Sequence, residues 1–407
     1  MTTQDFPYIK TIHVNDCYTY KNFDIVISEN DEWRHLILTG KNGSGKTTIL
    51  NGIAAQINLL ANKDIRNQFN SFKNALKVDP TSPSADAWKK MVHDFEYNVS
   101  EIKLTNQISQ DSLNNKNSFV FSHFKAYRKV QLSDVSSVTK ETEFVDKLQK
   151  TNSEGFTQQF KQYLVNKKVY QAFDVIENNK ESLNRIEEFF RTFTSILQNI
   201  FNDKNLELKF VREQFEFFIV LSDGREITFN VLSEGFSALL SVIMDILMRV
   251  DLIRKLKNDY TFDPPGIVLI DEPETHLHLE MQYQVLPLLT KLFPNIQFIA
   301  ATHSPAVISS ITNATVYDLS TQMTKKDEVA GSSFSELMVT HFGLDNEFSP
   351  VADKLIADVN QVLNEARTSK NPNEAREKLQ HILTENKEVL TPSLKLEIEA
   401  AILQLEQ

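Results

Sequence analysis

Three of the ten glycines in this chain of 407 residues lie within six positions, at Gly40, Gly43 and Gly45. The apolar run HLILT comes directly before them, and apolar residues at helical spacing follow from Lys46 to about residue 62. Glycine permits sharp turns and close approach of the backbone to another group, because it has no Cβ atom. The pattern therefore predicts an α/β fold in which a buried strand enters a tight loop and leaves it as a helix.

The segment GKNGSGKT also matches the phosphate-binding pattern G-x-x-x-x-G-K-[ST] in full. In this motif, backbone N–H groups and the positive end of the helix dipole converge on phosphate groups. Lys46 would reach the β- and γ-phosphates, and the Thr47 hydroxyl would ligate Mg²⁺. A glycine turn that only caps a helix is the alternative, which the strand before the loop and the helix after it disfavour. We predict that ATP is bound by Gly40, Asn42, Gly43, Ser44, Gly45, Lys46, Thr47 and Thr48.

Four apolar residues, Ile267 to Ile270, lead directly into Asp271 and Glu272. Such a run predicts a strand buried on both faces, and parallel sheets bind ligands beyond the carboxyl ends of their strands. We therefore predict Asp271 as a second Mg²⁺ ligand beside Thr47, and Glu272 as the base that orients or deprotonates the attacking water.

The segment LSEGF at residues 232–236 resembles the LSGGQ signature of ATP-binding-cassette (ABC) proteins. Ser233 and Gly235 match that signature, whereas Glu234 and Phe236 replace its first Gly and its Gln. In that superfamily the signature contacts the γ-phosphate of ATP bound to the opposite subunit. The resemblance therefore implies a head-to-tail dimer or higher oligomer in which Ser233 and Gly235 complete the partner's ATP site. An ordinary helix N-cap at Ser233 is the alternative.

Two further segments, DEPETHLH at residues 271–278 and THSP at residues 302–305, resemble the RecF, SMC and OLD-like branch of the ABC ATPases. The resemblance implies a P-loop NTPase fold of the ABC/SMC-head type, with His303 as the switch histidine that contacts the γ-phosphate. His276 and His278 are expected along the dimer interface. A zinc site is disfavoured for this pair, because no third ligand lies nearby in the sequence.

Two roles remain open among several residues. Arg128 or Gln131 is a candidate phosphate sensor, with a solvated turn at residues 126–129 as the alternative. The aromatic residue that stacks on adenine is Tyr18, Tyr20 or Phe23, and the sequence does not choose among them.

Periodicity and composition divide the chain into four parts. They are an N-terminal ATPase lobe with the phosphate-binding loop (1–130), a helical insertion (131–204), a C-terminal ATPase lobe with the signature, the acidic pair and His303 (205–330), and a helical tail (331–407). Residues 63–115 are predicted as helices separated by a surface loop. Three short strands are predicted between residues 206 and 230, the last two joined by a turn at Asp223–Gly224.

The composition of the chain disfavours several classes of protein and of binding partner. Apolar residues make up 41% and charged residues 24% of the chain, which excludes a disordered or fibrous protein. With 43 basic and 54 acidic residues, the net charge of −11 disfavours coating of nucleic acid over the whole surface, and leaves DNA a candidate partner only at a local basic groove. The single cysteine, Cys17, and the absence of a secretory pattern at the start favour the cytoplasm. The most apolar helical stretch, residues 236–250, is too short to span a membrane, so no membrane partner is expected.

Residues 331–350 and the charged segment after them resemble the end of the PtuA-type ATPases of Septu antiviral defence systems, whose partner is a small HNH nuclease. The resemblance implies a slow, regulatory ATPase that senses nucleotide and controls a separate nuclease. About 100 residues follow His303, which is too few for the TOPRIM domain of OLD nucleases plus a tail, so the chain is not expected to be a nuclease itself. A DNA-repair ATPase of the RecF or SMC kind, which clamps DNA, is the alternative. It is disfavoured because residues 48–232 show neither long heptad repeats nor excess positive charge.

Overall fold

The computed structural model describes Phe6, residues 8–325 apart from 19, 30–32, 106–117, 141 and 146–153, and residues 350–404 apart from 370–371, 387–389 and 391. The chain divides into two units, Met1–Phe334 and Ser335–Gln407, and each is described by itself. Within the described residues, no helix has both the length and the apolar character that are needed to cross a membrane.

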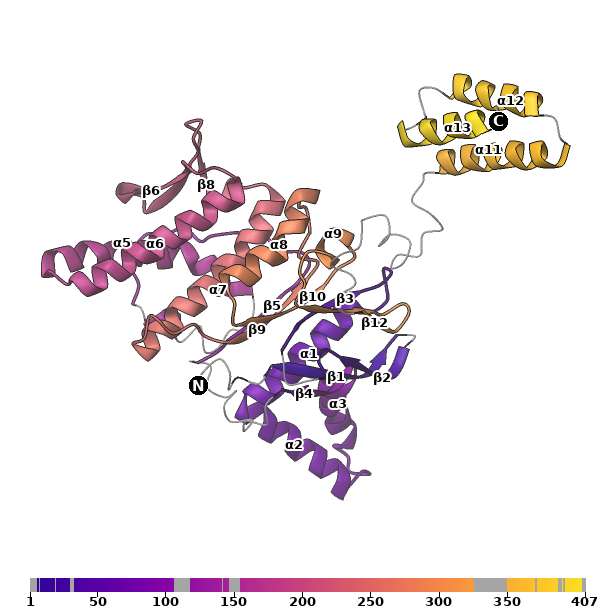
Figure 1. The fold of residues 1–407 in the computed structure, drawn as a ribbon. Coiled ribbons are helices and arrows are strands. Elements are labelled where there is room, and N and C mark those ends of the chain that lie inside the picture. Colours follow the sequence, from indigo (N-terminus) through magenta and orange to yellow (C-terminus); the bar gives the residue numbers. More distant parts are fainter. Residues whose placement is uncertain are drawn as a thin grey trace. The chain divides into compact units, whose positions relative to one another are not determined.

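A mostly parallel sheet of six strands forms the centre of the first unit (Figure 1). Among these strands only β12 runs antiparallel to its neighbour. Every residue of β3, β9 and β10 is buried. The buried strands predicted before the glycine-rich loop and before the acidic pair are thereby confirmed as β3 and β9. In spatial order the strands are β12 (Met323–Lys325), β11 (Ala314–Asp318), β3 (His35–Thr39), β10 (Ile296–Ala301), β9 (Gly266–Asp271) and β5 (Val120–Phe124).

The register of the three central strands decides where the site forms. Ala301 at the end of β10 lies opposite Asp271 on one side and Leu38 on the other. The strands β3, β9 and β10 therefore end together, so the loops that follow them meet at one edge of the sheet. This is the edge at which open α/β sheets bind ligands.

A second, antiparallel sheet has the order β2–β1–β4, with β1 at Ile9–Cys17, β2 at Tyr20–Val26 and β4 at Val99–Leu104. The strand β4 corrects the prediction of helices alone over residues 63–115. In β4, Val99 and Ile102 are buried, three residues apart, and its pairing with β1 shifts register. That irregularity removes the alternation of apolar and polar residues by which a strand is recognised in a sequence.

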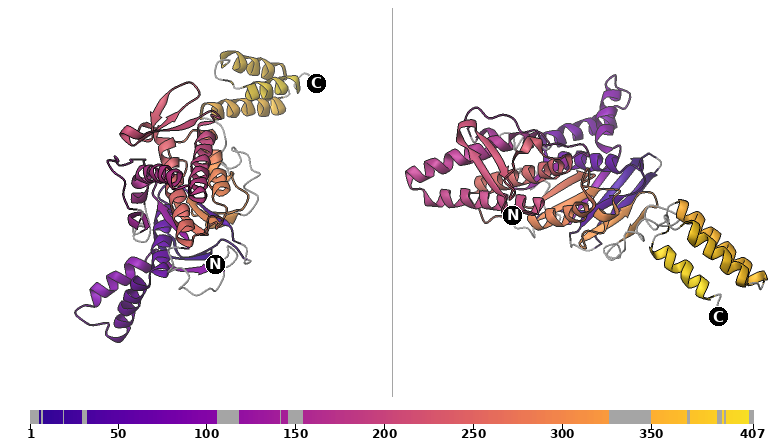
Figure 2. Two further views of the ribbon diagram at one scale, coloured as in Figure 1. Left: turned by 90° about the vertical axis from the view of Figure 1, so that its left-hand side faces the viewer. Right: turned by 90° about the horizontal axis from the view of Figure 1, so that it is seen from above.

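The helix α1 (Lys46–Ala61) follows β3 and packs against strands of both sheets. Ile49, Ile53 and Ile57 are buried on it at the predicted helical spacing. The helices α2 (Lys63–Val78) and α3 (Ala85–Glu96) follow as a hairpin that projects from the body of the unit (Figure 2). The surface loop predicted between two helices is confirmed at residues 79–84.

The helices of residues 160–201 and the small sheet of residues 207–228 lie at the end of the unit away from α2 and α3 (Figures 1 and 2). The predicted hairpin turn is confirmed: Gly224 has a φ of 85°, in the region that favours glycine, between β7 and β8. The helix α9 (Pro305–Ile308) follows His303 and Ser304. The other elements are η3 (Glu154–Gln159), α5 (Phe160–Glu177), α6 (Lys180–Phe201), β6 (Glu207–Val211), η4 (Arg212–Gln214), β7 (Glu216–Val220), β8 (Glu226–Thr228), η5 (Phe229–Val231), α7 (Glu234–Lys257) and α8 (Leu279–Leu292).

The second unit contains the helices α11 (Pro350–Ser369), α12 (Pro372–Glu385) and α13 (Pro392–Gln404). Each begins with proline, which suits the first helical position because its missing N–H has no partner there in any helix. Their contacts bury a small apolar core of Val362, Ala375, Leu379, Ile398 and Ile402. Residues 331–349, which carry most of the resemblance to the end of the PtuA-type ATPases, lie outside the described residues.

Candidate nucleotide-binding and hydrolysis site

The glycine-rich loop rests on the antiparallel sheet. Gly45 has a φ of 97°, and a Cβ atom at this position would lie 2.0 Å from the sulfur of Cys17, at the end of β1. The Cys17 thiol faces the carbonyl oxygens of Ser44 and Gly45, at 3.5 and 3.6 Å. Burial, with a smaller contribution from Asp16, raises the pKa of Cys17 to about 11, so the thiol stays protonated at neutral pH. Only glycine fits at position 45.

Lys46 begins α1, and its side chain is buried. Its Nζ donates hydrogen bonds to the carbonyl oxygens of Gly40 and Lys41, at 2.9 and 3.4 Å. The ammonium group is therefore held against the loop by neutral carbonyls. The hydroxyl oxygen of Ser44 is buried and has no hydrogen-bond partner among the described residues. A loop with a buried cation and an unpaired hydroxyl is suited to binding an anionic group such as phosphate.

The two predicted metal ligands contact each other. Thr47 Oγ1 donates a hydrogen bond to Asp271 Oδ2 at 2.7 Å, which joins the start of α1 to the end of β9. The other carboxylate oxygen of Asp271 is buried, and no described residue forms a hydrogen bond with it. Burial raises the pKa of Asp271, and the hydrogen bond from Thr47 opposes that rise. A hydroxyl and a carboxylate with an unsatisfied oxygen fit a hard divalent cation such as Mg²⁺.

The two predicted catalytic residues also lie together. Nδ1 of His303 lies 2.8 Å from Oε2 of Glu272. Glu272 follows β9 and His303 follows β10, and the Glu272 N–H donates to the Ala301 carbonyl at 2.7 Å, which holds the two strand ends side by side. Glu272 has a φ of 47°, which is uncommon for a residue with a side chain and is typical of functional turns.

Glu274 is a site residue to which the sequence analysis assigned no role. The Thr275 N–H donates to the Glu272 carbonyl, and this turn brings Glu274 beside Glu272. Burial raises the pKa of Glu274 to about 8, the adjacent Glu272 adds to the rise, and a hydrogen bond from Thr302 opposes it. Ligand atoms of Glu272, Glu274 and His303 all lie within 4.8 Å of one another. The Glu-Pro-Glu spacing was the available signal, because Pro favours such a turn.

Arg128 lies against the backbone of the acidic pair. Its Nη1 donates to the carbonyls of Lys125 and Asp271, both at 2.8 Å, and its Nη2 donates to the Glu272 carbonyl at 3.0 Å. Arg128 is buried, so it is not part of a solvated turn as the alternative interpretation held. Gln131, the other candidate sensor, is exposed. Sequence could not reveal the role of Arg128, because its partners are distant in the chain.

The signature-like segment forms the start of α7 and lies against the 271–278 segment of the same chain. A Cβ atom on Gly235 would lie 2.3 Å from the His276 carbonyl oxygen, so this helix start requires glycine. Ser233 occupies the N-cap position and is exposed, yet its side chain makes no capping hydrogen bond. No hydrogen bond or ion pair within the described residues joins Ser233 or Gly235 to the glycine-rich loop of their own chain.

The three aromatic candidates for adenine stacking differ in their surroundings. Tyr20 donates its hydroxyl proton to the Ser320 carbonyl, and Phe23 stacks on Tyr317. Tyr18 is 67% exposed, and its ring lies 3.3 Å from the position that a Cβ atom on Gly45 would occupy. Tyr18 therefore combines exposure with a place beside the loop.

The sequence matches the family model described as "AAA domain, putative AbiEii toxin, Type IV TA system" over residues 36–309. The chain therefore belongs to this family of AAA domains, and its architecture is the α/β fold with a mostly parallel sheet that the sequence predicted.

Among curated proteins, the chain is 24% identical to the Septu protein PtuA of Bacillus thuringiensis over 358 residues, which cover 82% of this chain and 85% of PtuA. It is 26% identical to the Retron Vc95 probable ATPase of Vibrio cholerae serotype O1 biovar El Tor over 368 residues, covering 73% of this chain and 71% of that protein. Among solved structures, the head of an SMC protein bound to the C-winged helix domain of ScpA matches with a TM-score of 0.38 and 14% identity, covering 79% of this chain and 96% of that one. The resemblance to PtuA-type ATPases is thereby confirmed.

Proposed function

We propose that this chain binds ATP with Mg²⁺ and hydrolyses it to ADP and phosphate. The observation that carries the proposal is the meeting of four side chains at one sheet edge. Thr47 lies 2.7 Å from Asp271, and Glu272 lies 2.8 Å from His303, on the neighbouring strand end. This proximity supports the proposal, because ATP hydrolysis requires a phosphate-binding loop, metal ligands and a base close together.

Each residue of the site has a separate role in the proposed reaction. The backbone N–H groups of residues 40–48 and Lys46 bind the phosphates. Thr47 and Asp271 would hold Mg²⁺, which would offset negative charge on the phosphate oxygens. Glu272 accepts the proton of the attacking water, and the adjacent His303 holds the Glu272 carboxylate and contacts the γ-phosphate. Tyr18 stacks on the adenine ring.

We further propose that the ATP site is completed by a second copy of the chain. Ser233 is exposed, its hydroxyl makes no cap, and Gly235 fixes the start of α7 against the 271–278 segment. An exposed signature serine at a helix N-terminus suits the γ-phosphate of ATP bound to another subunit. This arrangement supports the head-to-tail dimer, or a higher oligomer built from it.

The biological role that we propose is that of a nucleotide-gated sensor in prokaryotic antiviral defence, slow in turnover, which regulates a separate nuclease such as an HNH protein. Similarity to PtuA over most of both chains supports this role. Glu272, Glu274 and His303, whose ligand atoms could together hold a metal ion, lie at the proposed ATP site.

Two measurements test these proposals. Phosphate release from ATP and Mg²⁺ is expected from the native chain and not from Lys46→Ala; equal release by both would overturn the ATPase assignment. Co-purification with the product of the neighbouring gene, followed by a nuclease assay with and without ATP, tests the regulatory role. A nuclease whose activity is the same with and without the ATPase and ATP would exclude it.

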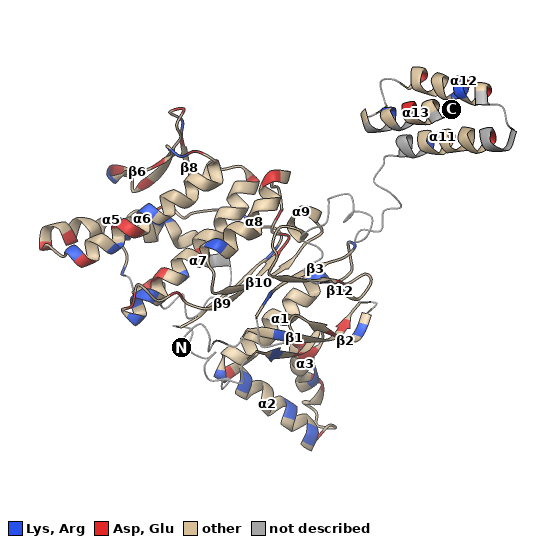
Figure 3. Ribbon diagram, in the orientation of Figure 1, with Lys and Arg blue, Asp and Glu red and all other residues tan. Residues whose placement is uncertain are grey.

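A DNA-clamping ATPase of the RecF or SMC kind is the second candidate, and the positive charge of α2 favours it (Figure 3). The helix α2 contains four basic residues and one acidic residue, and the spacing of the four basic residues puts them on one side of the helix. One of them, Lys73, forms an ion pair with Glu96 at 2.7 Å. The four are Lys63, Arg66, Lys73 and Lys77.

Binding of duplex DNA at low salt discriminates between the two candidates. A clamp requires that Lys63→Glu with Lys77→Glu weakens binding more than Lys89→Glu with Lys90→Glu, the matched control on α3. Equal effects, or no binding, would leave the sensor as the function.

A further inference from the structure

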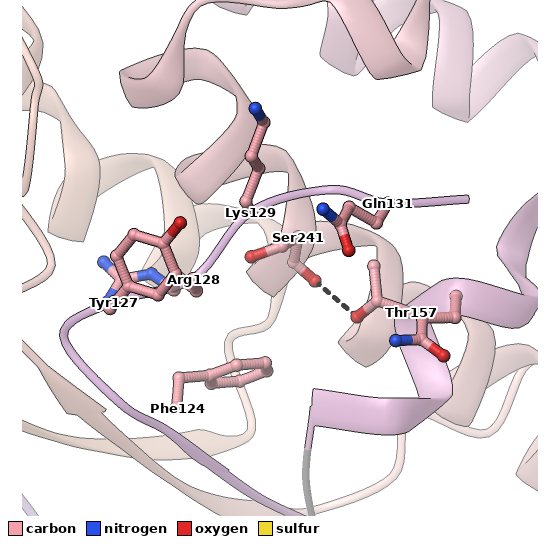
Figure 4. A pocket seen from close by; sticks show the side chains of 8 residues that line it. Phe124, Tyr127, Arg128, Lys129, Gln131, Thr157 and Ser241 are labelled. Atoms are coloured by element: carbon pink, nitrogen blue, oxygen red, sulfur yellow. Dashed lines mark hydrogen bonds between the residues drawn. The ribbon is translucent and has the colours of Figure 1, made fainter. Parts of the chain in front are cut away.

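A pocket of about 310 Å³ lies next to the acidic turn of the ATP site (Figure 4). Three separate segments form it: the loop after β5, the 3₁₀ helix η3 and the helix α7. No residue of the glycine-rich loop lines it, and every residue of that loop is described. The pocket is therefore distinct from the phosphate-binding loop. Its lining residues are Phe124, Tyr127, Arg128, Lys129, Gln131, Thr157, Gln158 and Ser241.

The lining combines positive charge, aromatic rings and uncharged polar groups. Arg128 and Lys129 contribute two cations, and none of the lining residues is acidic. In Figure 4 the Phe124 ring and the Tyr127 and Arg128 side chains lie on one side of the pocket, with Gln131 and Thr157 on the other. Because no acidic residue lines the pocket, its two cations favour binding of an anionic ligand. The aromatic rings favour a ligand with a planar group that can stack on them.

The hydrogen bonds around the pocket indicate which polar groups could bind a ligand. Thr157 Oγ1 donates to the Ser241 carbonyl at 3.2 Å, so its lone pairs remain as acceptors. Nη1 and Nη2 of Arg128 donate to backbone carbonyls, whereas Lys129 is exposed and has no ion pair within the described residues. Lys129 is thus the mobile cation of the pocket, and Gln131 supplies an exposed amide.

We propose that this pocket binds a small anion with a planar ring, of the size of a nucleoside monophosphate, at a regulatory site separate from the ATP site. The volume lies near the lower end of the range for small-molecule sites, which is about 300–1,000 Å³. A compact ligand fits such a volume. Lys129 forms an ion pair with the phosphate of the ligand, and the aromatic rings of the pocket stack on its base. The side-chain amide of Gln131 forms hydrogen bonds with the polar edge of the base.

The wall of the pocket connects two parts of the ATPase machinery. Arg128 holds the carbonyls of Asp271 and Glu272. Two residues further on, the Val130 N–H donates to Ser237 Oγ in α7 at 2.7 Å. One short segment therefore forms the pocket, holds the acidic turn and contacts the helix that begins with the signature. A ligand in the pocket restrains this segment, and through it the rate of ATP turnover.

Binding is tested without reliance on ATP hydrolysis, in the Lys46→Ala chain, by calorimetry with AMP and GMP. We expect one molecule bound per chain with at least one of them. Lys129→Glu is expected to weaken that binding tenfold or more, while Lys204→Glu, which changes the net charge equally and does not line the pocket, leaves it unchanged. Tyr127→Ala weakens it as well, and inorganic phosphate alone binds tenfold or more weakly than the nucleotide.

The opposite results overturn the proposal. Absence of heat with both nucleotides at millimolar concentration, or equal affinity of the Lys129→Glu and Lys204→Glu chains, excludes the site. The regulatory part is tested with the native chain: the nucleotide is expected to change ATP turnover there and not in Lys129→Glu. An unchanged turnover in the native chain excludes regulation. Each of these failures leaves the ATPase proposal intact, because that proposal rests on different residues.

Discussion

Nδ1 of His303 lies 2.8 Å from Oε2 of Glu272, although the two residues follow different strands of the parallel sheet. The contact exists because β9 and β10 are neighbours in register, with Asp271 opposite Ala301. Two loops that are separate in the sequence thus bring the two proposed catalytic residues together.

The first prediction concerns the base of this pair. Glu272→Gln keeps the size of the side chain and removes its ability to accept a proton. We expect ATP to bind normally and hydrolysis to fall by a factor of about 10² or more. Single-turnover phosphate release, with ATP binding measured separately, checks this. Turnover equal to that of the native chain would exclude Glu272 as the base.

The second prediction concerns the loop cation. Lys46→Ala removes the buried ammonium that now lies on the Gly40 carbonyl, and we expect it to abolish ATP binding. Lys41→Ala is the matched control, because Lys41 is an exposed lysine in the same loop. The Lys41→Ala chain should bind ATP as the native chain does. Calorimetry with a non-hydrolysable ATP analogue distinguishes the two. Retained binding in Lys46→Ala would mean that the loop is a structural turn.

The third prediction tests whether two chains share each site. Ser233 is the better target for mutation, because a side chain at Gly235 would clash with the His276 carbonyl and disturb the fold. Ser233→Arg and Lys46→Ala should each be inactive alone. Their mixture should regain part of the activity, since a mixed dimer contains one intact composite site. If mixed dimers form, as mass measurement can establish, and show no activity, each chain hydrolyses ATP unaided.

The fourth prediction concerns Arg128. Arg128→Lys keeps the charge but not the planar fork that reaches both the Asp271 and the Glu272 carbonyls. We expect kcat to fall by a factor of about 10–10², because small displacements of a catalytic group are costly. KM for ATP should stay within a few-fold, since the loop is untouched. A change in KM with kcat preserved would indicate contact with ATP instead of positioning of Glu272.

The fifth prediction follows from the pKa of Glu274, which burial raises to about 8 from its ordinary 4.5. Between these two pKa values the folded chain holds a proton that the unfolded chain has lost. The stability contributed by this group is therefore present below pH 4.5 and is lost as the pH rises toward 8.

Glu274→Gln mimics the protonated carboxyl group and should remove this loss. Thermal unfolding is expected to show the variant more stable than the native chain near pH 8, with the difference shrinking toward pH 5. Glu280→Gln, at an exposed position in α8, is the control and should show no such difference. A difference for Glu274→Gln that does not depend on pH would contradict the raised pKa.

The sequence specified those parts of the fold and site that depend on contiguous residues. The strands β3 and β9 contain the unbroken apolar runs Leu36–Leu38 and Ile267–Ile270, and the loop and the acidic pair come at the ends of these strands. Their meeting could therefore be predicted from the topology of a parallel sheet. The contact of Thr47 with Asp271 is of this kind.

Features that depend on tertiary contacts could not be predicted. Nothing in the sequence around Arg128 indicates that its guanidinium lies on the Asp271 and Glu272 carbonyls. The strand β4 was missed because its shifted pairing hides the usual alternation, and the burial of Glu274 depends on a turn whose depth in the fold the sequence does not show.

The sulfur of Cys17 occupies the space that glycine leaves free at position 45. Because the chain contains no other cysteine, a thiol reagent modifies the chain only at Cys17. The reagent must first displace the loop from β1, and the thiol must then lose a proton that its pKa of about 11 holds firmly. The rate at which the reagent labels Cys17 therefore measures opening of the phosphate-binding loop in the native chain, and no engineered probe is needed.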